Sequence, residues 1–119
     1  MVIPAALLRR FYVDGSLQNA EGGGFSFRLK NMVAPTTFIS LGPIEIDNEP
    51  YAANQVTLTA SKSRLASAVS DKSPLQFAMG KEISLHVSGE ALTPGEHELI
   101  VHAVTKEVGA VIIAVTENL

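Results

Sequence analysis

The final part of the chain contains two strand-like segments whose apolar residues fall on both faces. Residues 97–105 and 110–116 are rich in β-branched side chains and are joined at Glu107-Val108-Gly109. Successive side chains of a strand point to opposite sides of its sheet. One side carries Leu99, Val101, Val111, Ile113 and Val115, and the other carries Ile100, Val104, Ile112 and Ala114. An antiparallel sheet usually leaves one side to water, so we expect something to cover the second side of this one.

Similar alternation of apolar and polar residues recurs along the chain at intervals of roughly ten residues. The clearest examples are Phe25–Lys30, Ile44–Asp47, Val56–Thr59 and Glu82–Ser88. Turn-forming residues separate these segments. The spacing predicts an all-β fold: an antiparallel β-sandwich of about eight or nine short strands that forms a single domain over residues 1–119. Pro4 and the good helix formers after it predict a short N-terminal helix that ends near Tyr12.

Three local expectations concern connections between the strands. Gly109 suits the left-handed position of a three-residue loop, which predicts that Lys106 pairs with Ala110. Gly42-Pro43 is expected to end one strand before the next begins at Ile44. Residues 61–73 are the most polar stretch and are expected to connect the sheets, with at most one helical turn.

The composition excludes several functional classes. A net charge of -3 among 119 residues argues against a nucleic-acid partner, which requires a basic surface. No apolar stretch approaches the roughly 18 residues of a membrane span, and the apolar start lacks the basic segment of a signal peptide. The chain has no cysteine, which fits a cytoplasmic protein. Charged residues make up only 18% of the chain, which fits a protein that buries surface in a complex.

The candidate catalytic and metal-binding residues are few. His97 lies between Glu96 and Glu98, but consecutive strand residues point to opposite faces and cannot converge on one ion. His86 and His102 fall on what look like neighbouring strands, where two histidines and a carboxylate could hold a metal. We predict no catalytic, cofactor-binding or metal-binding residue in this chain. A metal-dependent enzyme would require His86, His97 and His102 to converge.

The second apolar face is the strongest candidate for a functional surface. We predict that it forms a partner interface, and its members are Ile100, His102, Val104, Ile112 and Ala114. The N-terminal helix is expected to cover part of this face with Leu7, Leu8 and Phe11. A two-turn helix is smaller than a typical interface of about 800 Å² per partner, so another chain is expected to cover the rest.

Four short motifs follow one another in a familiar order. They are Ser16-Leu17-Gln18-Asn19, Gly24-Phe25-Ser26-Phe27-Arg28-Leu29, Ile44-Glu45-Ile46-Asp47-Asn48-Glu49 and Leu92-Thr93-Pro94-Gly95-Glu96-His97-Glu98-Leu99. In this order the chain resembles the small β subunit of bacterial C-glycoside deglycosidases.

The resemblance implies a β-sandwich that pairs with a larger barrel subunit similar to sugar isomerases, with further oligomerisation of the complex left open. That partner would hold the divalent metal, expected to be manganese, and the complex would act as a lyase. It would cleave the carbon–carbon bond between a 3-oxo sugar and an aromatic aglycone. The present chain would then be an accessory subunit, and whether it counts as an enzyme is left open. The alternative is a stand-alone carbohydrate-binding or homo-oligomeric β-sandwich without catalysis.

Overall fold

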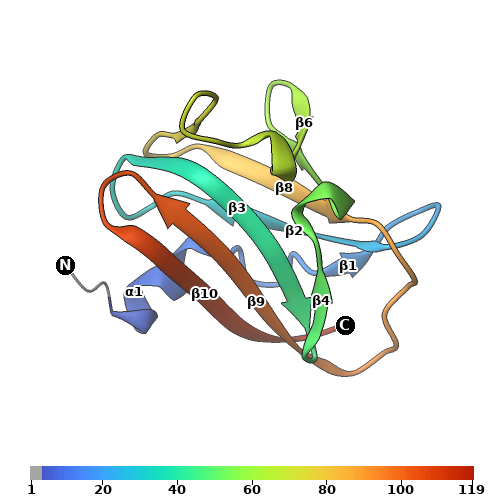
Figure 1. The fold of residues 1–119 in the computed structure, drawn as a ribbon. Helices are drawn as coiled ribbons and strands as arrows, with labels where there is room; N and C mark the ends of the chain where they lie inside the picture. Colours follow the sequence, from blue (N-terminus) through green and yellow to red (C-terminus); the bar gives the residue numbers. More distant parts are fainter. Residues whose placement is uncertain (1–3) are drawn as a thin grey trace.

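The computed structural model describes residues 4–119 and shows two antiparallel sheets packed face to face (Figure 1). In spatial order, the first sheet contains β1 (Gln18–Asn19), β2 (Phe25–Lys30), β8 (Glu82–Val87), β5 (Val56–Thr59) and β6 (Ser63–Leu65). The second sheet contains β10 (Gly109–Asn118), β9 (Glu96–Thr105), β3 (Thr36–Ile46) and β4 (Glu49–Tyr51), with β7 (Leu75–Phe77) paired to β3. The predicted β-sandwich is confirmed, although residues 4–119 contain ten strands because the short strands β4 and β6 were not expected.

The core lies between the sheets and follows from the alternation in the sequence. In β2, Phe25, Phe27 and Leu29 are completely buried, whereas Arg28 and Lys30 are exposed. Residues from the second sheet, including Phe38 and Ile44, close the core from the other side. Burial of each such side chain contributes about 1.5–3 kcal/mol, which makes this layer the main source of stability.

The N-terminal helix lies beneath β10 and on the core side of the second sheet (Figure 1). It consists of α1 (Ala5–Leu8) followed by the 3-10 turn η1 (Arg9–Phe11). Leu8 and Phe11 are buried and point toward Val111 and Ile113 on the inner face of β10. The expectation that this helix covers the outer face is therefore wrong, because its apolar side chains close the end of the core instead.

Strand β3 is continuous, so the expected break at Gly42-Pro43 is wrong. The strand stays paired with β9 across two irregularities, one between Phe38 and Ser40 and one between Leu41 and Ile44. Bulges of this kind absorb extra residues without ending a strand. Gly42 has a φ of +110°, and a Cβ placed there would lie 2.9 Å from the Cβ of Ala53. Only glycine fits this position, because a side chain would be both strained and in collision with the 3-10 turn η2 (Ala53–Gln55).

The β9–β10 hairpin has a different register from the expected one. Thr105, not Lys106, closes the ladder, and it pairs with Gly109. The Thr105 hydroxyl fixes this turn, since it accepts a hydrogen bond from the Val108 N–H at 3.0 Å and donates one to the Gly109 carbonyl at 3.1 Å. The change shifts each pairing by two residues, which keeps every side chain on its predicted face.

The polar stretch over residues 61–73 is more ordered than expected. It forms strand β6 and then the 3-10 turn η3 (Ala66–Ala68). The Arg64 guanidinium donates hydrogen bonds to the carbonyls of Ala68 and Ser73, each at 2.8 Å. These hydrogen bonds join the beginning of the connection to its end and so stabilise its conformation.

Within residues 4–119, neither α1 nor any 3-10 turn has the length and apolar character needed to cross a bilayer.

Candidate interaction surface

The outer faces of the two sheets differ sharply in chemistry. The outer face of the first sheet is mainly polar, with the exposed Leu65 of the edge strand β6 as an exception, and its polar side chains are Ser26, Arg28, Lys30, Thr57, Thr59, Glu82, Ser84 and His86. The outer face of the second sheet instead carries several apolar side chains. We call Ile100, His102, Val104, Ile112 and Ala114 the outer face of the hairpin. Apolar side chains that gather on one exposed face often mark an interaction surface.

The exposure of individual side chains marks the centre of this face. Ile112 is 51% exposed, although it neighbours Val111 and Ile113, which are 8% and 1% exposed. Ile100 and Val104 are half-buried, and Ala114 is exposed. The structure therefore places all five predicted interface residues on one surface, and coverage of that surface by a partner stays a prediction.

A histidine–carboxylate pair lies within the outer face of the hairpin. His102 Nε2 is 2.5 Å from Oε2 of Glu45, and the two side chains are 33% and 27% exposed. The pairing of β3 with β9 brings them together across 57 residues of sequence. Sequence reasoning selected His102 but missed Glu45, because alternation shows that Glu45 points outward without showing which strand lies beside it.

Carboxylates gather at the end of this surface where β3 turns into β4. Glu96 and Glu98 project from β9 on the same side as Ile100, and both are exposed. Asp47 and Glu49 lie at the adjacent turn. Among residues 4–119, no lysine or arginine forms a salt bridge with any of these four carboxylates. Asp47 is paired with His97, and Glu49 is paired in register with the core-facing Ile46. The outer face of the hairpin is therefore apolar at its centre, and Glu96 and Glu98 make it negatively charged at one end.

His97 lies on the opposite, core-facing side of β9 and is 6% exposed. Its Nδ1 is 2.6 Å from Oδ2 of Asp47, and its Nε2 is 2.6 Å from the Thr93 carbonyl oxygen. Both partners only accept hydrogen bonds, so the arrangement satisfies both contacts when the ring carries two protons. The Thr93 carbonyl, followed by the Asp47 carboxylate, raises the pKa of His97. The Glu98 N–H, followed by His97, lowers the pKa of Asp47.

These shifts predict how stability depends on pH near neutrality. Because the pKa of His97 is raised in the folded state, its stabilising contribution is complete below about pH 6.5. That contribution is lost as the pH rises through the raised pKa. Urea unfolding at pH 6 and pH 9 is expected to show a larger loss of unfolding free energy in the wild type than in His97→Gln. The control His86→Gln, on the other sheet, should retain the wild-type pH dependence, and parallel curves for all three proteins would contradict the assignment.

The three histidines do not converge, so the structure gives the metal-dependent alternative no site. His86 lies on the outer face of the first sheet, where its Nε2 is 3.2 Å from the Gly23 carbonyl oxygen. The expectation that it approaches His102 is wrong, because β8 and β9 follow one another in sequence but belong to different sheets. In the described part of the chain, no three histidine, cysteine, aspartate or glutamate side chains gather closely enough to hold a metal ion.

Comparison with known families identifies the chain over nearly its whole length. The profile of the family described as hydroxymethylglutaryl-CoA reductase, N-terminal domain, matches residues 7–119. The chain belongs to this family. A comparison with curated proteins found no match.

Membership of this family corrects the earlier identification. The resemblance to the small subunit of C-glycoside deglycosidases is wrong, and so is the carbon–carbon lyase function drawn from it. The carbohydrate-binding or homo-oligomeric alternative gains no support either. The four motifs misled because each consists of a turn plus alternating residues, which most sandwich strands share. The barrel partner and its manganese followed from that resemblance alone and stay untested predictions.

Proposed function

We propose that this chain is a docking domain of a hydroxymethylglutaryl-CoA reductase, with no chemistry of its own. Its outer hairpin face would hold the catalytic part of the reductase, whether that part lies on the same polypeptide or on another. The observation that carries the proposal is the apolar cluster around the exposed Ile112 at the centre of the second sheet, beside a first sheet whose outer face is polar except for Leu65 on its edge strand. Family membership supplies the class of partner.

The charge pattern specifies what the partner should present. The centre requires an apolar surface, and the end formed by Glu96 and Glu98 favours lysine or arginine side chains. The His102 ring gives the Glu45 carboxylate a hydrogen-bond partner, so the pair can be covered without leaving an unpartnered carboxylate in an apolar environment. Because the flanking charges are exposed, binding should weaken as salt increases.

Association with the catalytic part of the reductase tests this proposal directly. Ile112→Asp is expected to weaken binding by roughly 100-fold, since it puts an unpaired charge at the centre of the interface. The matched control is Ser84→Asp, which places the same group on the polar outer face of the first sheet. Isothermal titration calorimetry with both variants gives the two affinities.

Three results would contradict the docking role or the face assigned to it. The first is unchanged binding by Ile112→Asp, which would show that the partner contacts another surface. The second is reduction of hydroxymethylglutaryl-CoA by the isolated chain, which would show that the domain carries the chemistry itself. Loss of binding in both Ile112→Asp and Ser84→Asp would also exclude the assigned face.

A further inference from the structure

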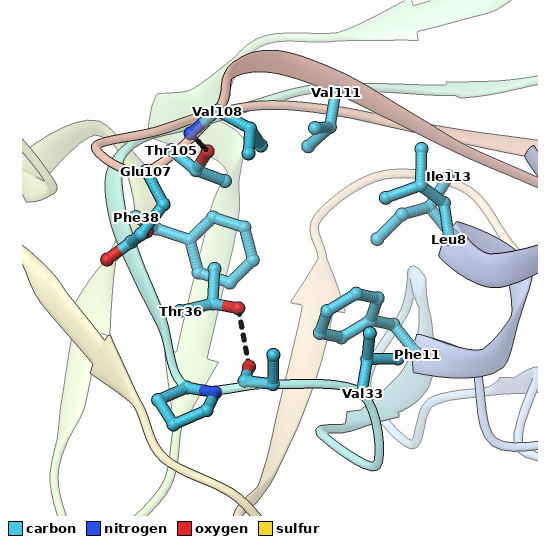
Figure 2. Close-up of a pocket in the computed structure, with 12 residues that line it drawn as sticks. Leu8, Phe11, Val33, Thr36, Phe38, Thr105, Glu107, Val108, Val111 and Ile113 are labelled. Atoms are coloured by element: carbon cyan, nitrogen blue, oxygen red, sulfur yellow. Dashed lines mark hydrogen bonds between the residues drawn. The ribbon is translucent and has the colours of Figure 1, made fainter. Parts of the chain in front are cut away.

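A cavity opens between the N-terminal helix and the end of the second sheet (Figure 2). Its volume is about 90 Å³. In this view Leu8, Phe11 and Ile113 lie on one side of the cavity, Val111 lies above it, and Phe38 lies on the opposite side. The lip comes from residues 33–36 and from the turn between β9 and β10.

Every polar side chain in the lining already has a partner within the protein. Thr36 donates its hydroxyl hydrogen to the Ala34 carbonyl at 2.8 Å, and the Thr105 hydroxyl is held by the turn that follows β9. The Glu107 carboxylate accepts the Thr37 N–H at 2.9 Å. A buried water needs two to four polar partners, and apart from the remaining acceptor sites of Glu107 and of the Thr36 hydroxyl, the side chains of the lining are apolar. The cavity therefore favours an apolar occupant.

The lip is held in place by a buried side chain outside the cavity. Asn31 donates to the carbonyls of Ala34 and Phe77 and accepts from the N–H groups of Val33 and Ala34. The opening is therefore fixed before any ligand arrives, which lowers the cost of binding.

The Glu107 carboxylate at the mouth of the cavity determines which ligand charge can be bound there. The Thr37 N–H lowers the pKa of this carboxyl, so it is ionised at neutral pH. A second anion beside it would be repelled.

We infer that the cavity binds a small alkyl group of about four carbons that is uncharged or cationic at its polar end. This volume is smaller than the roughly 150 Å³ cavity that holds benzene. A carboxylate or phosphate ester, including coenzyme A, does not fit this charge pattern.

Methyl NMR titration of the full chain with 1-butanol, n-butylammonium and butyrate tests the inference. Butanol and butylammonium are expected to shift the methyl signals of Leu8, Val111 and Ile113 in a saturable way. Butyrate should bind at least fivefold more weakly, and Glu107→Gln should remove that difference. Glutamine keeps an oxygen that can accept the Thr37 N–H, so this variant leaves the turn intact.

A variant that fills the cavity distinguishes binding in the cavity from nonspecific effects of the added compounds on the protein. Ala34→Phe places a ring at the mouth and should abolish the saturable shifts. Ala91→Phe, at an exposed position in the loop after β8, should bind as the wild type does. The inference is overturned by an absence of saturable shifts in the wild type, or by equal shifts in the Ala34→Phe protein. Butyrate binding as tight as butanol would overturn the assigned ligand class.

Discussion

Ile113→Asp is expected to abolish cooperative folding, whereas Ile112→Asp is expected to leave the fold intact. Ile113 is 1% exposed and faces the core beside Leu8 of α1, so an aspartate there would bury a charge without a partner. The lost packing costs about 2–5 kcal/mol, and the buried charge adds several more. Together they approach the whole stability of an ordinary domain, which is about 5–15 kcal/mol.

Ile112 offers an unusually well-matched control, because it is the same residue type on the same strand. Its side chain is 51% exposed on the outer face, so an aspartate there stays hydrated. The expected cost is about 1 kcal/mol, set mainly by the lower strand preference of aspartate. Circular dichroism and urea unfolding of both variants measure the difference. Equal destabilisation would show that the inner and outer faces of β10 are wrongly assigned.

If Ile113→Asp yields no soluble protein, Ile113→Ala provides the quantitative comparison. It removes the packing without adding a charge, and the expected loss of unfolding free energy is about 2–5 kcal/mol. Ile112→Ala should lose less than about 1 kcal/mol, since little buried area is removed. Equal losses of unfolding free energy in the two alanine variants would also show that the faces of β10 are wrongly assigned.

Asn31→Leu is expected to lower the unfolding free energy by about 3–4 kcal/mol. Asn31 is completely buried, and its side-chain amide forms four hydrogen bonds with the backbone. Its Nδ2 is 2.6 Å from the carbonyl oxygen of Phe77 in β7, which ties the segment before β3 to the second sheet. Leucine fills a similar volume but leaves these backbone groups unsatisfied, at about 1–3 kcal/mol for each that stays buried.

Asn54→Leu is the control for this prediction, because Asn54 is exposed in η2. Its expected effect lies within about 0.5 kcal/mol. Chemical denaturation gives both values, and hydrogen exchange at Val33 and Ala34 reports whether the lip of the cavity has loosened. A loss below about 1 kcal/mol in Asn31→Leu would mean that water replaces the amide and that the segment is not anchored by it.

Sequence reasoning succeeded where the deciding interactions are local. The alternation in β2, β8, β9 and β10 fixed which side chains face the core, and the glycine-containing turns marked where strands end. It was less successful at Gly42-Pro43, because a bulge and a true strand end require similar residues. It also misjudged the N-terminal helix, since an apolar helix face does not reveal which of two apolar surfaces it will cover.

The functional interpretation went wrong for a related reason. Turns with alternating residues describe a class of fold rather than a family, so the order of four such motifs carried less information than it seemed to. The match over residues 7–119 uses the whole chain and replaces that interpretation. The surplus of apolar surface on the hairpin does not depend on either family, because it follows from the residues of β9 and β10 themselves.

By itself, the sequence determined that this chain forms strands and that its last hairpin has two apolar faces. Both follow from a side-chain period of two, which is a property of neighbouring residues. Only the tertiary structure decided that His97 meets Asp47, that His102 meets Glu45, and that His86 lies far from both on the other sheet. Those pairings join residues about 50 or more positions apart, and they depend on which strands become neighbours when the sheets fold together.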